Sequence, residues 1–226
     1  DVARKSFNIP FGESEQFAWI GLLPSYLERS DSSLVDMVHY FMSTSIYSEN
    51  IFFPKVGDEL IGTLKGLHER KIPTVLIGVS FALLDLFERT DVPVWDDLVV
   101  IETGGMKGRG QEITRDELYG RLRKNNKHIR LASEYGMTEL LSQAYMNEKH
   151  FEPGPAMRVC MRDISDPLKL IGHGQRGIIN VIDLANVDTC AFIATDDVGM
   201  SYPDGSFDVL GRVDNSDLRG CNLMYV

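Results

Sequence analysis

The sequence predicts an α/β fold in which a mainly parallel sheet is covered by helices and is followed by a smaller β-rich subdomain. In the first two-thirds of the chain, apolar runs alternate with amphipathic stretches, as in proteins whose parallel strands are joined by helices. The last third holds short strand-like runs instead. Residues 151–155 contain two prolines and a glycine, so we expect an α/β part at 1–150 and a β-rich part at 151–226.

The elements of the α/β part follow from their apolar periods. Continuous apolar runs predict strands that are buried on both faces of the sheet. Amphipathic stretches between them predict helices, with Ser30 or Asp31 as the first N-cap and with Thr114 and Glu117 as a later capping box. Strands are thus expected at 17–23, 73–78, 98–101 and 128–132, and helices near 34–41, 57–70, 81–89 and beyond 114.

The β-rich part is predicted to consist of short strands at 157–161, 177–184 and 191–195. Pro203, Asp204 and Gly205 then form a turn sequence between two further strands.

Charge and cysteine content narrow the function classes. The 226 residues have a formal net charge of -10, which argues against a general nucleic-acid binder and requires any nucleotide site to supply its own positive groups. The three cysteines, Cys160, Cys190 and Cys221, form neither a CxxC pair nor a disulfide framework, so we expect reduced thiols and a cytoplasmic protein. The sequence has no apolar run long enough to predict a membrane span.

A glycine-rich stretch, residues 104–110, follows the strand predicted at 98–101. Glycines allow backbone N–H groups to approach a ligand, and Lys107 and Arg109 add positive charge. The spacing matches neither a Walker loop nor a dinucleotide fingerprint, so a flexible surface turn is an equally simple interpretation.

The second candidate is the sequence Tyr-Gly-Met-Thr-Glu at residues 135–139, also after a predicted strand. The Thr138 hydroxyl and the Glu139 carboxylate suit a phosphate and its Mg²⁺, since Mg²⁺ is commonly held by one or two carboxylates together with substrate phosphates. In open α/β sheets, ligands bind at the carboxyl ends of strands. The alternative is a helix start with Thr138 as a minor cap.

Two further candidates lie in the β-rich part. Asp197, in Thr-Asp-Asp-Val-Gly at a predicted strand end, can accept hydrogen bonds from both hydroxyls of a ribose, although acidic turns are common. Arg212, in Gly-Arg-Val-Asp at 211–214, can bind a ribose or phosphate oxygen, or it can form a simple salt bridge at a strand end.

Taken in order, these motifs resemble those of the adenylate-forming superfamily, whose members make acyl-AMP from ATP and a carboxylic acid. That family has Y-G-x-T-E, a G-x-x-G turn before a strand, T-G-D and G-R-x-D. The corresponding segments here are 135–139, 174–177, 195–197 and 211–214, and the resemblance spans residues 15–226. It implies that this chain is a fragment of the N-terminal domain of such an enzyme, with residues 1–150 as the nucleotide-binding part.

Three strings resemble the acyl-protein synthetase branch of that superfamily in particular: ETGGMKGRG at 102–110, EYGMTELLSQAY at 134–145 and GRVDNSDLRGCNLM at 211–224. Enzymes of this branch activate a long-chain fatty acid and pass it to a protein cysteine. The resemblance implies a ligase that uses ATP and Mg²⁺, with Cys221 as acyl acceptor and an acyl-reductase or acyl-carrier protein as partner.

The resemblance also implies a role for each matching residue. Thr138 would contact the α-phosphate, Glu139 would hold Mg²⁺, Asp197 would bind the ribose hydroxyls with Arg212 in support, and Asp214 would mark the hinge to a C-terminal lid. The residues implied around the rest of the nucleotide are Gly104, Gly105, Lys107, Tyr135 and Gly136.

The sequence departs from the family pattern in several places. Asp196 replaces the middle glycine of T-G-D, and the stretch from Gly211 to Gly220 is one residue shorter than is common. The family's phosphate-binding loop and its C-terminal lid with a catalytic lysine have no counterpart here, so we expect the 226 residues alone to turn over poorly. Two alternatives remain: coenzyme A as the acyl acceptor, and a catalytically silent domain that binds nucleotide or a partner.

Overall fold

The computed structural model describes residues 1–213 except 25, 28–30, 90–91, 105–112, 125–128 and 148. These residues form two compact units. One unit runs from Phe7 to Thr138, and the other contains Asp1–Ser6 together with the residues from Glu139 onwards. The α/β class and the smaller β-rich part are as predicted.

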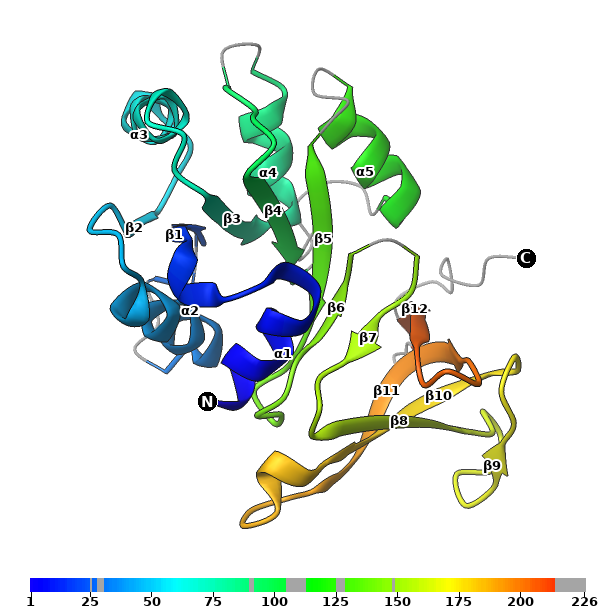
Figure 1. The fold of residues 1–226 in the computed structure, drawn as a ribbon. Coiled ribbons are helices and arrows are strands. Elements are labelled where there is room, and N and C mark those ends of the chain that lie inside the picture. Colours follow the sequence, from blue (N-terminus) through cyan, green and yellow to red (C-terminus); the bar gives the residue numbers. More distant parts are fainter. Residues whose placement is uncertain are drawn as a thin grey trace. The chain divides into compact units, whose positions relative to one another are not determined.

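The unit from Phe7 to Thr138 is built on five parallel strands in the order β2-β1-β3-β4-β5. Helices precede or follow these strands along the chain, as the alternating pattern predicts (Figure 1). The strands are β1 (Ala18–Leu22), β2 (Ile51–Phe53), β3 (Thr74–Val79), β4 (Leu98–Thr103) and β5 (Arg130–Tyr135). The helices are α1 (Val2–Phe11), whose first residues belong to the other unit, η1 (Ser14–Gln16), α2 (Ser33–Thr44), α3 (Asp58–Glu69), α4 (Ser80–Phe87) and α5 (Arg115–Arg123).

Two helix starts depend on hydroxyl caps. The Ser32 side chain accepts a hydrogen bond from the Val35 N–H at 3.3 Å and is the N-cap of α2. The prediction of Ser30 or Asp31 for this role was therefore wrong by one or two positions, because a helical period locates a start only approximately. At α5 the predicted cap is confirmed, since the Thr114 hydroxyl accepts from the Glu117 N–H at 3.2 Å.

Aromatic side chains form the core beside β1. Trp19 and Phe41 stack with ring centroids 4.3 Å apart, and Phe7 lies 4.9 Å from Trp19. All three side chains are buried. Stacked and tilted ring pairs at these distances add to the stabilisation that burial of apolar area provides.

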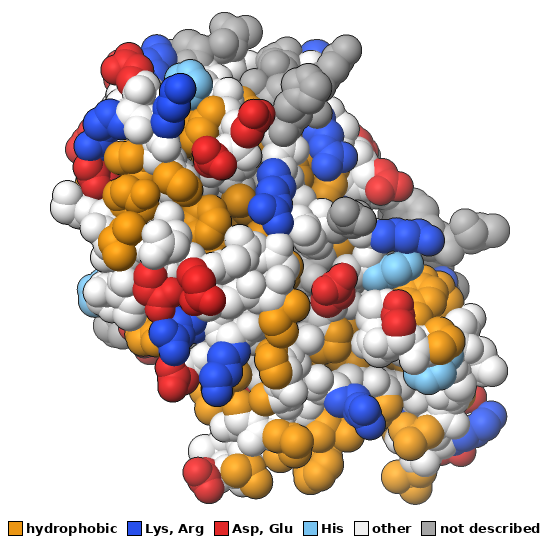
Figure 2. Space-filling model, viewed as in Figure 1, with side chains coloured by type: hydrophobic (Ala, Val, Ile, Leu, Met, Phe, Trp, Pro, Cys, Tyr) orange, Lys and Arg blue, Asp and Glu red, His pale blue; other side chains and the backbone are white. Residues whose placement is uncertain are grey.

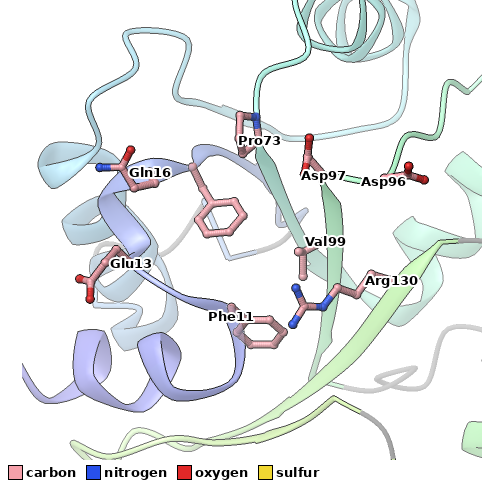
Figure 3. Close-up of a pocket in the computed structure, with 9 residues that line it drawn as sticks. Phe11, Glu13, Gln16, Pro73, Asp96, Asp97, Val99 and Arg130 are labelled. Atoms are coloured by element: carbon pink, nitrogen blue, oxygen red, sulfur yellow. The ribbon is translucent and has the colours of Figure 1, made fainter.

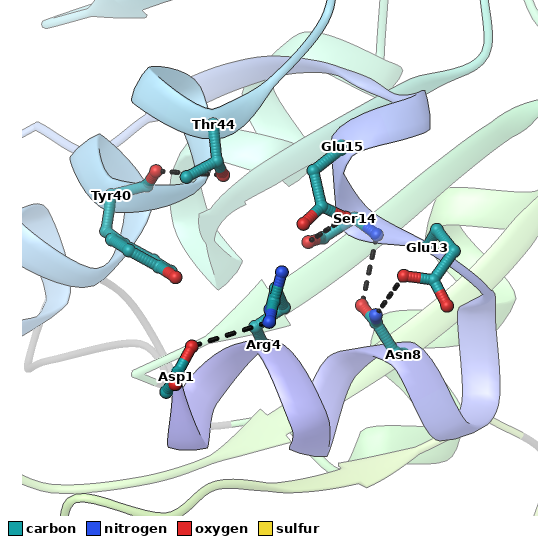
Figure 4. Close-up of polar contacts among 8 residues, drawn as sticks. All are labelled: Asp1, Arg4, Asn8, Glu13, Ser14, Glu15, Tyr40 and Thr44. Atoms are coloured by element: carbon teal, nitrogen blue, oxygen red, sulfur yellow. Dashed lines mark hydrogen bonds and ion pairs between the residues drawn. The ribbon is translucent and has the colours of Figure 1, made fainter.

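The Asn8 side chain stabilises the connection between α1 and η1 through two hydrogen bonds (Figure 4). Its side-chain oxygen accepts a hydrogen bond from the Ser14 N–H at 3.0 Å, and its amide nitrogen donates to the Glu13 carboxylate at 2.7 Å. These two bonds satisfy polar groups at a turn where no regular ladder can do so.

The other unit contains a short antiparallel pair and a five-stranded antiparallel sheet of order β12-β11-β10-β8-β9. The short pair is β6 (Ala144–Met146) with β7 (Glu152–Pro153), and the sheet contains β8 (Met157–Arg162), β9 (Leu170–Ile171), β10 (Arg176–Asp183), β11 (Phe192–Ser201) and β12 (Phe207–Arg212). A short helix, η2 (Leu184–Asn186), joins β10 to β11. The predicted turn at 203–205 is confirmed, with Gly205 at φ 90°.

Strand β11 is longer than predicted, because it runs from Phe192 to Ser201 rather than ending at Thr195. The acidic pair Asp196 and Asp197 therefore lies inside a strand and not at its end. A bulge in the pairing with β12 interrupts the register between Val198 and Gly199. A Cβ on Gly199 would lie 2.4 Å from the carbonyl oxygen of Asp208, so this close approach requires glycine.

The units divide after Thr138, whereas the sequence places a boundary at 150/151. Pro153 instead ends β7, and residues 154–156 connect β7 to β8 within one unit. Gly154 there packs so tightly that an added Cβ would meet the Ser6 hydroxyl, which is one contact between the first six residues and the rest of their unit.

Large apolar side chains are exposed on the antiparallel sheet and its hairpins (Figure 2). They include Leu168, which is 93% exposed, and Phe192, which is 73% exposed. Much of the accessible surface of folded proteins is apolar, so exposed hydrophobic side chains alone do not indicate a function.

Candidate functional site

The carboxyl ends of β4 and β5 bring two of the predicted nucleotide residues to one edge of the parallel sheet. Gly104 directly follows β4 with φ 75°, a left-handed conformation that favours glycine. Tyr135 ends β5 and is 9% exposed, and Gly136 follows it. Because β4 and β5 are adjacent and parallel, Gly104 and Tyr135 lie at the same edge, where ligands bind in open α/β sheets.

A network of hydroxyls surrounds Glu102 near this edge. One carboxylate oxygen accepts a hydrogen bond from the Ser80 hydroxyl, and the other accepts from the Ser133 hydroxyl at 3.0 Å. The Tyr119 and Ser133 hydroxyls are 2.9 Å apart. Burial raises the pKa of Tyr119 to about 12 despite its hydrogen bond with Ser133, so the phenol keeps its proton at neutral pH.

A second carboxylate, Glu134, lies on β5 beside Thr103 of β4. The Thr103 hydroxyl donates to its oxygen at 2.5 Å. The pKa of Glu134 is raised to about 7, chiefly by burial and also by the charge of Glu102, while the hydrogen bond from Thr103 opposes the shift. Glu134 thus exchanges its proton near neutral pH, next to residues that the sequence assigns to the nucleotide.

Thr138 lies in a turn after β5 and is exposed. It does not begin a helix, so the alternative interpretation as a helix cap is not supported by the geometry. The Ser33 hydroxyl donates to the Thr138 hydroxyl at 3.4 Å, and Ser33 is the first residue of α2. The N-terminus of α2, which bears a partial positive charge, therefore lies next to Thr138.

Glu139 begins the other unit and has an exposed side chain. Its carbonyl oxygen accepts a hydrogen bond from the Asn186 side-chain amide at 2.6 Å. Two residues further on, the Leu141 N–H donates to the Asp183 carboxylate at 2.8 Å. The backbone that presents the Glu139 carboxylate is thus fixed by buried side chains, while the carboxylate itself faces solvent.

Asp197 and Arg212 stand opposite each other on β11 and β12. The Arg212 Nε lies 3.9 Å from Asp197 Oδ1. The Asp197 side chain is only 19% exposed, whereas that of Arg212 is 71% exposed. The structure therefore brings together the two motifs that contain these residues, and they present an acceptor beside a cation.

Hydrogen bonds of Thr195 and Asp196 fix the backbone of β11 next to Asp197. The buried Thr195 hydroxyl donates to the Ile179 carbonyl at 2.8 Å and accepts from the Asp197 N–H at 3.0 Å. Asp196 replaces a glycine of the family pattern, but it lies in an extended strand and its carbonyl accepts from the Val213 N–H at 2.8 Å. A strand position does not require glycine, so an aspartate is compatible with the backbone here.

The predicted site residues are divided between the two units. Gly104, Tyr135, Gly136 and Thr138 belong to the unit from Phe7 to Thr138, and Glu139, Asp197 and Arg212 belong to the other. Gly105, Lys107, Asp214 and Cys221 lie outside the described residues.

Sequence reasoning missed four residues near these positions: Ser33, Glu134, Asp183 and Asn186. Ser33 follows the N-cap serine, and Glu134 directly precedes the tyrosine of the motif, so both had a local signal. Asp183 and Asn186 had none, because their partners lie more than 40 residues away.

A cavity of about 310 Å³ lies elsewhere in the unit from Phe7 to Thr138 (Figure 3). It contains Arg130, the first residue of β5, whose guanidinium lies over the Phe11 ring and donates to the Pro10 carbonyl at 2.7 Å. The cavity therefore opens at the amino ends of the strands. None of the predicted site residues lines it.

Within the described ranges, no group of three or more His, Cys, Asp or Glu side chains could hold a metal ion by itself. Among the helices described, none is long and apolar enough to cross a membrane.

Neither protein-family profiles nor curated proteins match the chain. Solved structures do, at low identity. The o-succinylbenzoate coenzyme A synthetase from Bacillus subtilis, in complex with ATP and magnesium ion, superposes with a TM-score of 0.64 and 19% identity, covering 92% of this chain and 44% of that chain. A long-chain-fatty-acid–CoA ligase from Archaeoglobus fulgidus gives 0.64 and 17%, covering 92% and 46%.

The luciferase-like enzyme from the nonluminescent Zophobas morio mealworm gives a TM-score of 0.60 at 14% identity, covering 88% of this chain and 49% of that chain. The chain thus spans less than half the length of these structures. At such identities the likeness concerns the fold. The chain therefore has the fold found in part of this coenzyme A synthetase, this CoA ligase and this luciferase-like enzyme, in agreement with the fold that the resemblance predicts.

Proposed function

We propose that this chain is part of an adenylate-forming ligase that activates a carboxylic acid, such as a long-chain fatty acid, as acyl-AMP. The observation that supports this best is the pairing of Asp197 with Arg212. Two motifs that are 15 positions apart in sequence place a nearly buried carboxylate beside an exposed guanidinium. Such a pair suits a ribose, whose hydroxyls donate to the carboxylate and accept from the arginine.

The residues present also fit ATP and Mg²⁺. Glu139 offers an exposed carboxylate on a fixed backbone, and Thr138 offers a hydroxyl at the N-terminus of a helix. Mg²⁺ would neutralise phosphate charge as the carboxylate of the substrate displaces pyrophosphate. The chain's own contribution to this step is to bind and orient the nucleotide.

The acceptor of the acyl group is a thiol in this proposal. The strings at 102–110, 134–145 and 211–224 favour a protein cysteine, with Cys221 as the acceptor and an acyl-reductase or acyl-carrier protein as partner. The names of two similar structures favour coenzyme A instead. Labelled fatty acid, ATP and Mg²⁺ given to the protein and to its Cys221→Ser variant separate these acceptors. Loss of hydroxylamine-labile protein label in the variant supports Cys221, whereas unchanged thioester formation on added coenzyme A excludes it.

Activation itself is tested by carboxylate-dependent exchange of labelled pyrophosphate into ATP. In the full-length protein, Glu139→Ala should abolish this exchange, because it removes the proposed Mg²⁺ ligand. Glu152→Ala, which changes an exposed carboxylate on β7 of the same unit, should leave the exchange unchanged. Normal exchange by Glu139→Ala would refute the assignment of the metal ligand. A chain that binds no nucleotide at all would support the alternative of a silent partner-binding domain.

A further inference from the structure

The segment that carries Glu139 has no regular secondary structure, yet its backbone is tightly held. Residues 139–142 form neither helix nor strand, so helix or ladder bonds do not fix them. The contacts that do fix them come from the last residue of β10 and from the connection that follows it, and they all lie within one unit.

Asp183 is the first of two anchors. Its side chain is completely buried and accepts four hydrogen bonds. One oxygen accepts from the N–H groups of Leu141 and Ser142, at 2.8 and 3.0 Å. The other accepts from the Ser142 hydroxyl at 2.7 Å and from the Ala185 N–H at 3.1 Å. A buried carboxylate is tolerated only when it is hydrogen-bonded in this way, and here three of the four donors belong to the segment after Glu139.

Asn186 is the second anchor and is 8% exposed. Its amide nitrogen donates to the Glu139 carbonyl at 2.6 Å and to the Cys190 carbonyl at 3.1 Å. The Thr189 hydroxyl donates to its amide oxygen, which fixes the orientation of the side chain. Asn186 thereby fixes the residue that bears the carboxylate, three positions after the Asp183 that holds Leu141 and Ser142.

We infer that Asp183 and Asn186 are positioning residues for the Glu139 carboxylate, which they aim by fixing the backbone on both sides of Leu140. This inference rests on the proposed role of Glu139 in binding Mg²⁺ with the nucleotide. Partners that orient a metal ligand typically change metal affinity or activity by 10- to 100-fold when they are mutated. A role in folding alone would instead alter stability without a specific effect on Mg²⁺.

Asp183→Asn and Asn186→Ala test the inference separately. Asn at 183 keeps the size of the side chain but replaces one acceptor oxygen with a donor. Ala at 186 removes the bond to the Glu139 carbonyl and leaves Asp183 intact. Asp204→Asn is a matched control, since Asp204 accepts from the N–H and hydroxyl of Ser206 at 3.0 and 2.6 Å in a turn of the same unit.

The first measurement is hydrogen–deuterium exchange of the protein without metal or nucleotide. Asp183→Asn should speed exchange of the Leu141 and Ser142 amides by about tenfold or more, because their acceptor is weakened, and Asp204→Asn should not. Unchanged exchange of both amides in Asp183→Asn would overturn the anchoring role of Asp183.

The second measurement is calorimetric binding of an ATP analogue with a methylene between the α- and β-phosphates, in EDTA and in a Mg²⁺ titration. Both variants should bind the analogue in EDTA within about twofold of the unchanged protein and should need 10- to 100-fold more Mg²⁺ for the metal-dependent gain. An unchanged Mg²⁺ requirement, or an equal loss with and without Mg²⁺, would overturn the inference. Failure of the proposed function is distinct, since the unchanged protein would then show no Mg²⁺-dependent binding.

Discussion

Arg212 lies directly opposite Asp197 across β11 and β12, with its Nε 3.9 Å from Asp197 Oδ1. The arginine side chain is largely exposed, so the attraction between the two groups contributes little to stability. Their alignment is therefore more informative about ligand binding than about folding. A ligand with vicinal hydroxyls would meet both groups at once.

Asp197→Asn should weaken ATP binding about 10- to 100-fold, because hydrogen bonds to a charged acceptor are worth about 1.5–3 kcal/mol. Calorimetry with ATP and with its 2′,3′-dideoxy analogue measures the effect. The unchanged protein should prefer ATP, and the variant should lose that preference. Asp196→Asn, on the neighbouring exposed position, is the control. Equal discrimination by both variants would count against the ribose assignment.

An acyl-AMP mimic with a sulfamoyl linkage should bind at least about 100-fold more tightly than ATP, since mimics of reaction intermediates gain contacts that the substrate lacks. Competition calorimetry with a long-chain fatty acyl mimic measures this ratio. A mimic without the acyl chain shows how much the acid contributes. Equal affinity for ATP and the acyl mimic would argue against an adenylating site.

The pKa of Glu134 predicts a dependence of stability on pH. Its folded-state pKa of about 7 lies above the ordinary value of 4.5, so the folded protein binds the proton more tightly than the unfolded chain. This contribution is present below pH 4.5 and is lost as pH rises through 7. The side chain in Glu134→Gln does not ionise, so this loss of stability between pH 5 and pH 8 should disappear. The free energy of unfolding of the variant, relative to that of the unchanged protein, should be up to about 3 kcal/mol higher at pH 8 than at pH 5.

Urea denaturation at pH 5, 6, 7 and 8 checks this prediction for Glu134. Glu152→Gln, at an exposed position, should leave the pH dependence of the free energy of unfolding unchanged. Parallel pH profiles for Glu134→Gln and the unchanged protein would show that Glu134 is not protonated near neutrality.

Gly199→Ala should destabilise the protein by about 1–3 kcal/mol, because its Cβ would lie 2.4 Å from the Asp208 carbonyl oxygen and 2.7 Å from Ile179 Cδ1. Gly172→Ala is the matched control, since its nearest contact would be a flexible side-chain atom at 3.8 Å. Thermal or urea unfolding of both variants measures the difference. An unchanged free energy of unfolding in Gly199→Ala would mean that β11 and β12 can move apart there without loss of stability.

Local periodicity was sufficient to predict most of the fold. The run from 98 to 101 is apolar on both faces, and it forms the buried strand β4. The amphipathic stretch from 57 to 70 forms α3, with Leu60, Leu64 and Leu67 buried on one face. Such patterns determine which residues face the core, but they do not determine where an element ends. The predicted N-cap of α2 and the predicted end of β11 were wrong for this reason.

The candidate site was predictable only where its residues form short motifs. Gly104 and Tyr135 each stand at the end of a predicted strand, so their meeting at one sheet edge followed from parallel pairing. Asp183 could not be assigned from sequence, because a single aspartate at the end of a strand gives no sign of its partners at Leu141 and Ser142. The anchors of a loop depend on long-range packing, and no local period encodes them.

The bulge between β11 and β12 decides which of two consecutive aspartates meets the arginine. Val198 pairs with Gly211, but Gly199 pairs with Val209, so β12 contains one additional residue, Leu210. An unbroken ladder through the same sequence would place Arg212 opposite Asp196, on the other face of the strand. The number of residues in β12, and not only the identity of the charged residues, therefore determines which carboxylate lies opposite Arg212. Insertion or deletion of a single residue in β12 is expected to change nucleotide recognition more than many substitutions would.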